Sequence, residues 1–249
     1  DPQSNLLIHR YRGMIPEGLL NYLALLGWSL SKDRDVFSRE EMVEAFDIHD
    51  VGPNPARFDP VKCEAINAEQ VRALEAADFR DRLVPHLADA LPDPTGRTAP
   101  APLVSAASFD ALTEREQEIL TAAAPLIQTR IQLLRECRDM LGFLFVDDAD
   151  LVVDDAAVGG LKDSAPAVLD AAIGALEGLG GAEWTTARLE ESLRAAIVDG
   201  LGIKPRLAFG PLRVAVTGRR VSPPLFESME ILGRDSSLTR LRALRASLA

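Results

Sequence analysis

Apolar residues recur along this chain three and four positions apart, which is the spacing of one face of an α-helix. Phe79, Leu83 and Leu87 repeat at every fourth position, and the pair Leu189 and Leu193 does the same further along. No long stretch alternates apolar and polar residues, as a half-buried β-strand would. The pattern therefore predicts an all-α protein built of helical bundle modules.

Capping boxes mark three predicted helix starts, at residues 38–41, 67–70 and 113–116. In each, the side chain at the first position can accept a hydrogen bond from a backbone N–H that has no partner within the helix itself. We expect the third helix to break at Pro125, because proline lacks a backbone N–H. A new helix is then predicted from Leu126 to Leu141.

The first part of the chain has a leucine stripe and two turn-rich segments. Residues 1–15 are predicted to be a loop with a short extended piece, and Pro16 begins a helix. Gly27 ends that helix, whose predicted apolar stripe is made of Leu19, Leu20, Leu23 and Leu26. Proline and glycine also predict loops at residues 50–60 and 92–102.

The last part of the chain has the clearest signals for where helices begin and end. Pro211 opens a short periodic segment and Gly218 closes it. Ser222 lies directly before Pro223, a favoured first helical residue, so a second helix is predicted to begin there. Gly233 ends it. A third helix follows, with Leu238, Leu241, Leu244 and Leu248 on one side and Arg240, Arg242 and Arg245 between them.

Charge separates this basic end from the rest of the chain. The 249 residues carry a net charge of −11, whereas residues 206–249 contain eight arginines and three acidic residues. A basic end on an acidic protein indicates a local site for a polyanion. The alternative interpretation is a solvated helix face with ordinary arginines.

Other chemistry is sparse. The two cysteines, Cys63 and Cys137, and the three histidines have no ligand spacing, so no metal site is predicted. The acidic run at residues 147–155 lacks the pattern of a calcium loop and is interpreted as a solvated loop. No apolar run reaches the ~20 residues of a membrane span. With reduced thiols, a cytoplasmic protein is expected, and the start at Asp1 without Met indicates an excised fragment.

Several motifs together resemble one family. The runs PLRVAVTG, SPPLFE and LGRDSSLTRL near the C-terminus resemble the end of bacterial glutamyl-tRNA synthetases, which are class I aminoacyl-tRNA synthetases. LIHRYRGMIPEGLLNYLALLGWS near the N-terminus and PARFDPVKCEAIN resemble the same family, in the same order. The resemblance implies three parts: the end of a stem-contact domain at residues 1–68, and two helical anticodon-binding modules at residues 69–160 and 161–249.

The resemblance also implies a function and its limits. The parent enzyme would be a glutamate–tRNA ligase, which attaches glutamate to its tRNA with ATP and Mg²⁺. This chain has neither of the two ATP-binding signatures of a class I synthetase, and no glycine-rich phosphate loop. The fragment alone is therefore expected to be inactive and to need no cofactor. Its expected partner is glutamate tRNA, with no DNA or membrane, and it is expected to be a monomer.

The resemblance assigns candidate tRNA contacts. Arg213, Ser222, Pro223 and Leu225 match positions that contact the anticodon. An arginine can stack on a base and donate to its edge, and we expect free backbone groups at the predicted helix start to read a base. Arg130 matches the arginine that reads the third anticodon base. The alternative is a helical surface arginine paired to Glu136.

Phosphate contacts to the tRNA stem are expected from three further cations. These are Arg10, Arg12 and Lys62. Two observations weigh against an RNA-binding protein: aromatic residues are only 5% of the chain, and the net charge is −11. They leave open a second hypothesis, an all-helical scaffold that binds another protein and no RNA.

Overall fold

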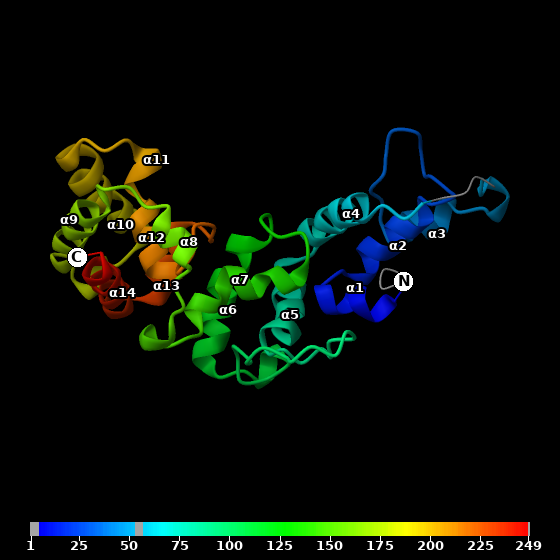
Figure 1. Cartoon of the computed structure of the whole chain (residues 1–249). Coiled ribbons are helices and arrows are strands. Elements are labelled where there is room, and N and C mark those ends of the chain that lie inside the picture. Colours follow the sequence, from blue (N-terminus) through cyan, green and yellow to red (C-terminus); the bar gives the residue numbers. More distant parts are fainter. Residues whose placement is uncertain (1–4, 53–56, 249) are drawn as a thin grey trace. The chain divides into compact units, whose positions relative to one another are not determined.

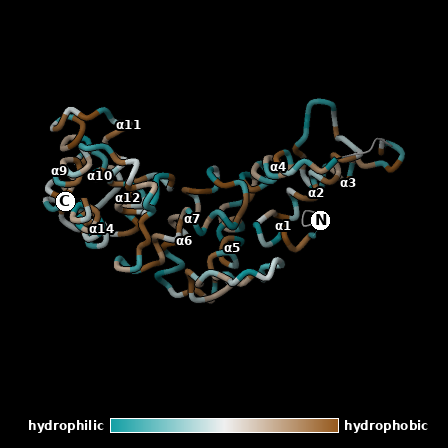
Figure 2. Tube along the Cα trace, in the orientation of Figure 1, coloured by the Kyte–Doolittle hydropathy of each residue, from teal (hydrophilic) through white to brown (hydrophobic). Residues whose placement is uncertain are grey.

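The computed structural model describes residues 5–52 and 57–248, and these form an all-α protein, as predicted. Within them the only β-type pairing is an isolated bridge between Ser31 and Arg34. The chain forms two compact units, unit 1 at residues 1–138 and unit 2 at residues 139–249. Figure 1 shows the helices of both units, and Figure 2 shows apolar and polar residues interspersed along them.

Unit 1 contains six complete α-helices in its described residues. They are α1 (Leu6–Arg12), α2 (Pro16–Ala24), α3 (Arg39–Ala45), α4 (Pro60–Ala73), α5 (Ala76–Leu87) and α6 (Glu114–Ile127). Short 3-10 turns lie at Ile48–Asp50, Phe109–Ala111 and Leu134–Glu136. Helix α7 (Cys137–Leu141) crosses the boundary between the units.

Helices α2 and α4 pack together closely at one glycine. A Cβ atom on Gly18 would lie 2.3 Å from Oδ1 of Asn67, so only glycine fits this position of α2. Around this contact, the core is formed by Met14, Tyr22, Cys63, Ile66 and Leu133. Of the predicted leucine stripe, Leu19 and Leu26 pack on this core, but Leu20 and Leu23 are exposed. Part of the stripe was therefore predicted wrongly.

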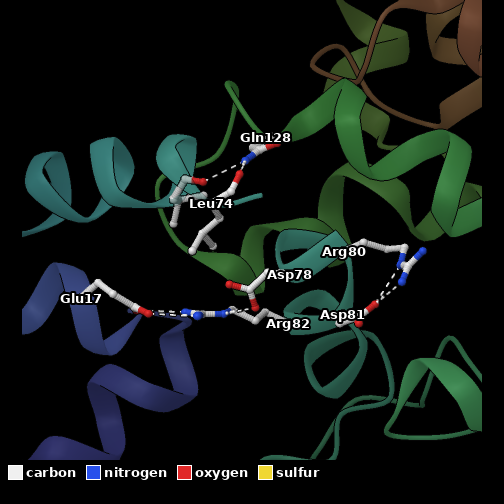
Figure 3. Close-up of polar contacts among 8 residues, drawn as sticks. Glu17, Leu74, Asp78, Arg80, Asp81, Arg82 and Gln128 are labelled. Carbon is white, nitrogen blue, oxygen red and sulfur yellow. Dashed lines mark hydrogen bonds and ion pairs between the residues drawn. The ribbon is translucent and has the colours of Figure 1, made fainter. Parts of the chain in front are cut away.

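Unit 1 is also joined by polar contacts between distant segments. The guanidinium of Arg82 in α5 lies between two carboxylates, bonding Glu17 through both Nη atoms at 2.9 Å and Asp78 through Nε at 2.8 Å (Figure 3). These bonds lower the pKa of the Glu17 carboxyl below its ordinary value. In the same view, Nε2 of Gln128 donates to the carbonyl of Leu74 just after α4, at 2.8 Å (Figure 3).

Unit 2 packs seven further α-helices around buried leucine, valine and alanine. They are α8 (Asp155–Gly159), α9 (Ala165–Glu177), α10 (Thr186–Leu193), α11 (Pro205–Ala208), α12 (Gly210–Thr217), α13 (Leu225–Leu232) and α14 (Arg234–Ser247). A π-helical segment, Arg194–Asp199, continues α10, and 3-10 turns lie at Gly142–Leu144, Asp148–Asp150 and Gly181–Glu183. Helix α14 packs against α9 and α12, so the C-terminal helix completes the core of this unit.

Arg240 of α14 lies inside unit 2 with 3% of its surface exposed. Its Nε donates to Oδ1 of Asp148 at 2.6 Å, and its Nη atoms donate to the carbonyls of Phe143, Val146 and Val216 at 2.9–3.1 Å. The sequence prediction of an interleaved surface arginine is therefore wrong for Arg240. The reason is that this side chain satisfies three carbonyls and a carboxylate that the packing would otherwise leave without partners.

The acidic run at residues 147–155 is also partly structural. Asp148 pairs with Arg240, and Asp154 caps α8 by accepting from the N–H of Ala156 at 3.0 Å. The other three carboxylates of the run accept no side-chain hydrogen bond or ion pair among the described residues. The interpretation as a wholly solvated loop needs this correction.

Two helix starts in unit 1 differ from the sequence prediction. Residues 6–12, predicted as non-helical, form α1, because Asn5 caps it and Gly13 ends it at a φ of +90°. Asn67, predicted as a cap, lies in the middle of α4. That helix begins earlier, where Oδ1 of Asp59 accepts from the N–H groups of Val61 and Lys62. The predicted loop at residues 50–60 thus ends at Asp59, and its residues 53–56 lie outside the described part.

The helix prediction around Pro125 is also wrong. Helix α6 continues through Pro125 to Ile127, because the buried Ala124 and Ile127 pack its last turn. Thr121, whose carbonyl loses its helical donor to Pro125, is exposed, so water can bond this carbonyl. The predicted helix from Leu126 to Leu141 does not form. In its place a turn leads to the 3-10 turn Leu134–Glu136 and the short α7. The capping boxes at Ser38 and Thr113 are confirmed.

Candidate nucleic-acid interface

Arg213, Ser222 and Pro223 come together in unit 2, although they are nine and ten positions apart. Nη1 of Arg213 donates to the carbonyl of Pro223 at 2.7 Å and to the hydroxyl of Ser222. Ser222 and Pro223 are buried, and Arg213 is half-buried. The guanidinium is therefore held in one orientation at the surface of the unit.

The turn after α12 creates this arrangement. Gly218 ends α12 at a φ of +74°, and a Cβ atom there would lie 2.4 Å from the carbonyl oxygen of Val152. The carbonyl of Gly218 accepts from the N–H of Asp154 at 2.9 Å. These contacts turn the chain so that residues 219–224 run back beside α12. A residue with a side chain at this position would be strained by its φ and by the neighbouring backbone.

The predicted helix start at Ser222 is wrong. Helix α13 begins at Leu225, with Pro224 as its cap. The carbonyl of Pro223, predicted to be free for a base edge, already accepts from Arg213. Leu225 is only 4% exposed, so it supports the cluster from below. The resemblance assigned these residues to one site, and in the structure the serine hydroxyl and the proline carbonyl accept hydrogen bonds that fix the arginine.

A groove of about 520 Å³ lies beside this cluster and includes Arg213 in its wall. Among the residues whose side chains are described, its other cations are Lys162 and Arg220, and no acidic residue lines it. Phe209 also lines the groove and packs edge to face against Phe226, with ring centroids 5.2 Å apart. The remaining wall is mainly small and apolar, and comes from residues 157–164 and 205–214.

Sequence reasoning missed Lys162, Arg220 and Phe209. Phe209 stands two residues before Pro211, so its nearness to Arg213 was a usable signal. Lys162 belongs to a segment 51 positions before Arg213, and no pattern in the sequence joins the two. Phe209 partly answers the objection from the low aromatic content, because one well-placed ring provides a stacking platform.

The candidates of unit 1 are all at its surface. Arg130 is exposed in the turn after α6, so the predicted helical position is wrong. Its alternative partner, Glu136, instead accepts from the N–H groups of Gln132 and Leu133 at 3.3 and 3.2 Å. Among the described residues, the Arg130 side chain makes no hydrogen bond or ion pair.

The three cations expected at the tRNA stem differ in their partners. Arg12 pairs with Glu64 at 2.6 Å and Lys62 with Asp35 at 2.8 Å, and all four side chains are at least 24% exposed. Arg10 is exposed and has no such pair within the described part of the chain. Exposed pairs of this kind open at small cost, so both cations stay accessible to a phosphate.

Two further features concern the cysteine, histidine and carboxylate side chains. No group of three or more His, Cys, Asp or Glu side chains in the described residues could hold a metal ion. Burial raises the pKa of the Cys63 thiol to about 11, so this thiol is not a reactive thiolate at neutral pH. None of the described helices is long and apolar enough to cross a membrane.

Comparison with known proteins gives consistent results. The sequence model of the anticodon binding domain family matches residues 78–245. A glutamate–tRNA ligase of Kocuria rhizophila is 59% identical over 249 residues, which are all of this chain and 46% of that protein. A glutamate–tRNA ligase of Kineococcus radiotolerans is 59% identical over 250 residues, again 46% of its length. The chain thus spans about half the length of the curated relatives it matches.

Solved structures share the fold. A crystal structure of a glutamate tRNA ligase from Elizabethkingia meningosepticum, in complex with its amino acid, aligns with a TM-score of 0.74 at 19% identity. The alignment covers 97% of this chain and 43% of that one. At this identity the likeness concerns the fold, and it agrees with the all-α architecture described above.

Proposed function

The chain belongs to the anticodon-binding domain family, and from this membership we propose that it is the tRNA-recognition part of a glutamate–tRNA ligase. The whole enzyme would attach glutamate to its tRNA with ATP and Mg²⁺, and this part would read the anticodon. We keep the three-part division in the proposal: residues 1–68 finish a stem-contact domain, and residues 69–160 and 161–249 are the anticodon-binding modules.

One observation carries the proposal. Arg213 is held by Ser222 and Pro223 at the wall of a groove whose described lining contains cations, an aromatic ring and no carboxylate. Anticodon bases are unpaired, so they can be turned out, stacked and bonded on their edges. A fixed guanidinium and a ring are the groups that such recognition needs. The groove is also locally basic, on a chain whose net charge is −11.

Arg130 is proposed to read a second base. Its side chain is exposed and unpaired among the described residues, as a base-reading group must be before RNA binds. We propose the third anticodon base as its target, which would help to separate glutamate from glutamine tRNAs. Arg10, Arg12 and Lys62 are proposed to contact phosphates of the tRNA stem.

The test is a titration of the chain with glutamate tRNA and with a copy changed only in its anticodon. We expect the parent chain to prefer the natural anticodon, and Arg213→Ala to lose most of that preference. A well-placed arginine–base contact is worth about 1–3 kcal/mol, so the loss should be about tenfold or more. Equal binding of both RNAs by the parent chain would contradict the proposal.

Arg213→Lys is the matched control for folding. Lysine keeps the charge, but it cannot reproduce the fixed planar fork of arginine. If Arg213→Lys keeps the helical circular dichroism of the parent and still loses the preference, the effect comes from base recognition. Arg130→Ala should change binding only for copies altered at the third anticodon base.

A protein-binding scaffold is the second candidate, and exposed apolar residues favour it. Val43 of α3 is 69% exposed, Ile48 is 67% and Phe46 is 45%. Such residues on neighbouring turns are typical of a surface that meets another protein or domain. This candidate predicts no affinity for either RNA, so the same titration separates it from tRNA recognition.

A further inference from the structure

We propose that Lys162 and Arg220 form a phosphate-binding subsite beside Arg213, which holds a backbone phosphate of the anticodon loop. This inference rests on the proposed function and extends it. Arg213 would read a base, whereas the two other cations of the groove would bind the backbone independently of sequence. The two contributions can be separated by experiment.

These two cations have no carboxylate partner among the described residues. Lys162 and Arg220 are exposed, and no carboxylate of the described residues lies within 4 Å of either. The adjacent Arg219 differs, because it pairs with Asp139 at 2.8 Å. Two unpaired cations at one groove repel each other and raise the local positive potential. An anion is the ligand that offsets this repulsion.

The groove also excludes competing acids. The described part of its lining holds Lys162, Arg213 and Arg220 and no acidic side chain, although Asp and Glu outnumber Lys and Arg in the chain by 38 to 27. A volume of about 520 Å³ has room for a nucleotide-sized group. Arg220 lies over Gly160, where a Cβ atom would be 3.1 Å from its Nη1, so the small residue leaves space for the guanidinium.

Two helix ends add to the positive potential of the groove. Ser164 lies just before α9, and Gly210 and Pro211 begin α12, and all three residues line the groove. Neither helix has an acidic residue in its first turn or a side-chain cap. The first turns of both helices therefore supply no carboxylate against the positive ends of their dipoles, and these ends add to the potential of the two side chains.

The geometry assigns different tasks to the three cations. Arg213 is fixed by Ser222 and Pro223, and a fixed planar donor suits the edge or face of a base. Lys162 and Arg220 are exposed, long and unpaired, which suits a phosphate whose oxygens accept from many directions. Phosphate contacts contribute affinity that depends on salt and not on the base sequence.

The experiment compares Lys162→Gln, Arg220→Gln and the double variant with the control Arg219→Gln. Arg219 is the adjacent arginine, is also exposed, and does not line the groove. Each chain is titrated with glutamate tRNA and with the anticodon-changed copy, at several salt concentrations. Circular dichroism and thermal melting establish that the variants fold as the parent does.

We expect the double variant to bind both RNAs about tenfold more weakly at low salt. The slope of log affinity against log salt should fall by about 1–2, because each lost phosphate contact releases about one counterion fewer. The ratio of the two affinities should stay at the parent value. The control Arg219→Gln should bind within about twofold of the parent.

Three results would overturn the subsite. The double variant could bind like the parent, it could change the affinity ratio, or Arg219→Gln could weaken binding equally. In each case the parent's anticodon preference would still support the proposed function. If the parent itself binds neither RNA, the proposed function fails first, so the two failures are distinguishable.

Discussion

The buried side chains that join distant segments differ between the two units, while half-buried arginines such as Arg82 and Arg138 also join segments of unit 1. In unit 1 these buried side chains include neutral amides. Oδ1 of Asn67 accepts from the N–H of Ile15 at 2.9 Å, and its Nδ2 donates to the carbonyl of Gln132 at 2.6 Å. In unit 2 an arginine has the corresponding role, since Arg240 binds three carbonyls and Asp148. An arginine offers five donors, so one side chain can join more segments than an amide can.

This difference changes how the charge of the C-terminal end should be interpreted. Among its arginines with described side chains, Arg220 alone has neither a carboxylate nor a carbonyl partner. The others donate within the unit: Arg213, Arg219, Arg234, Arg240, Arg242 and Arg245. A count of positive residues therefore overstates the surface available to RNA. The count of charges points to this end of the chain, but it does not distinguish the paired arginines from the unpaired one.

The largest expected effect comes from removing the buried arginine of unit 2. Arg240→Met should destabilise unit 2 by about 3–5 kcal/mol, because it leaves the Asp148 carboxylate without its cation and three carbonyls without donors. Trp184 is buried and its Nε1 donates to the carbonyl of Met229 at 2.8 Å, so its fluorescence reports unit 2. Urea unfolding in a Trp28→Phe background measures the change.

The matched control for Arg240→Met is Arg242→Met on the same helix. Arg242 is exposed, and among the described residues its side chain has Glu177 as its one polar partner, at the surface. If both variants lose the same stability, the buried network is not what holds unit 2. If Arg240→Met loses less than about 1 kcal/mol, repacking by an apolar side chain has replaced the ion pair, as happens in some proteins.

The second effect concerns a buried histidine side chain in unit 1. Burial lowers the pKa of His86 from 6.5 to about 4, with further lowering by Arg135 and other nearby arginines. The unfolded chain then binds more protons than the folded one between these values. Stability should be highest above about pH 6.5 and should fall as the pH drops toward 4, by about 3 kcal/mol from this group.

His86→Gln should flatten this part of the pH profile. The carbonyl of His86 would still accept from Nη1 of Arg138, because that contact involves the backbone. Unfolding of unit 1 is followed by the fluorescence of the buried Trp28, in a Trp184→Phe background. The carboxylates titrate in both proteins, so the difference between the two profiles isolates His86. Parallel profiles would contradict the assigned burial effect.

The third expected effect is smaller and concerns the side-chain amide of Asn67 in unit 1. Asn67→Ala should cost about 2 kcal/mol, because it leaves the N–H of Ile15 and the carbonyl of Gln132 without partners. The loss should not depend on salt, since no charge is removed. Asn5→Ala is the control, because its side chain accepts from the N–H of Leu7 at an exposed helix end. Equal losses in the two variants would show that burial is not the deciding factor.

These contrasts also explain which features the sequence could predict. The local signals were sufficient where a residue acts within one turn of its own helix, as Ser38 and Thr113 do at helix starts and Gly218 does at the end of α12. They were insufficient for Asn67, whose pattern fits a cap but whose partners are at residues 15 and 132. A capping box describes a possible bond, and tertiary packing decides whether that bond forms.

The candidate site shows the same limit. The resemblance brought Arg213, Ser222 and Pro223 into consideration together, and they do meet. The orientation of the contact was not predictable, because it depends on the turn that Gly218 makes against Val152. Lys162 was also beyond sequence reasoning, since only the folding of unit 2 brings residues 157–164 to the groove.

The smallest effect should come from the surface pairs of α14. Arg245 pairs with Asp170 at 2.8 Å, and these side chains are 32% and 56% exposed. Because water and salt screen such a pair, Arg245→Gln should cost less than about 0.5 kcal/mol in urea unfolding. Added salt should remove what difference remains. The affinity for glutamate tRNA should also be unchanged, because Arg245 already pairs with a carboxylate and does not line the groove. A large loss of tRNA binding would place the RNA on α14, and the unpaired cations of the groove would then not be the ones that bind it.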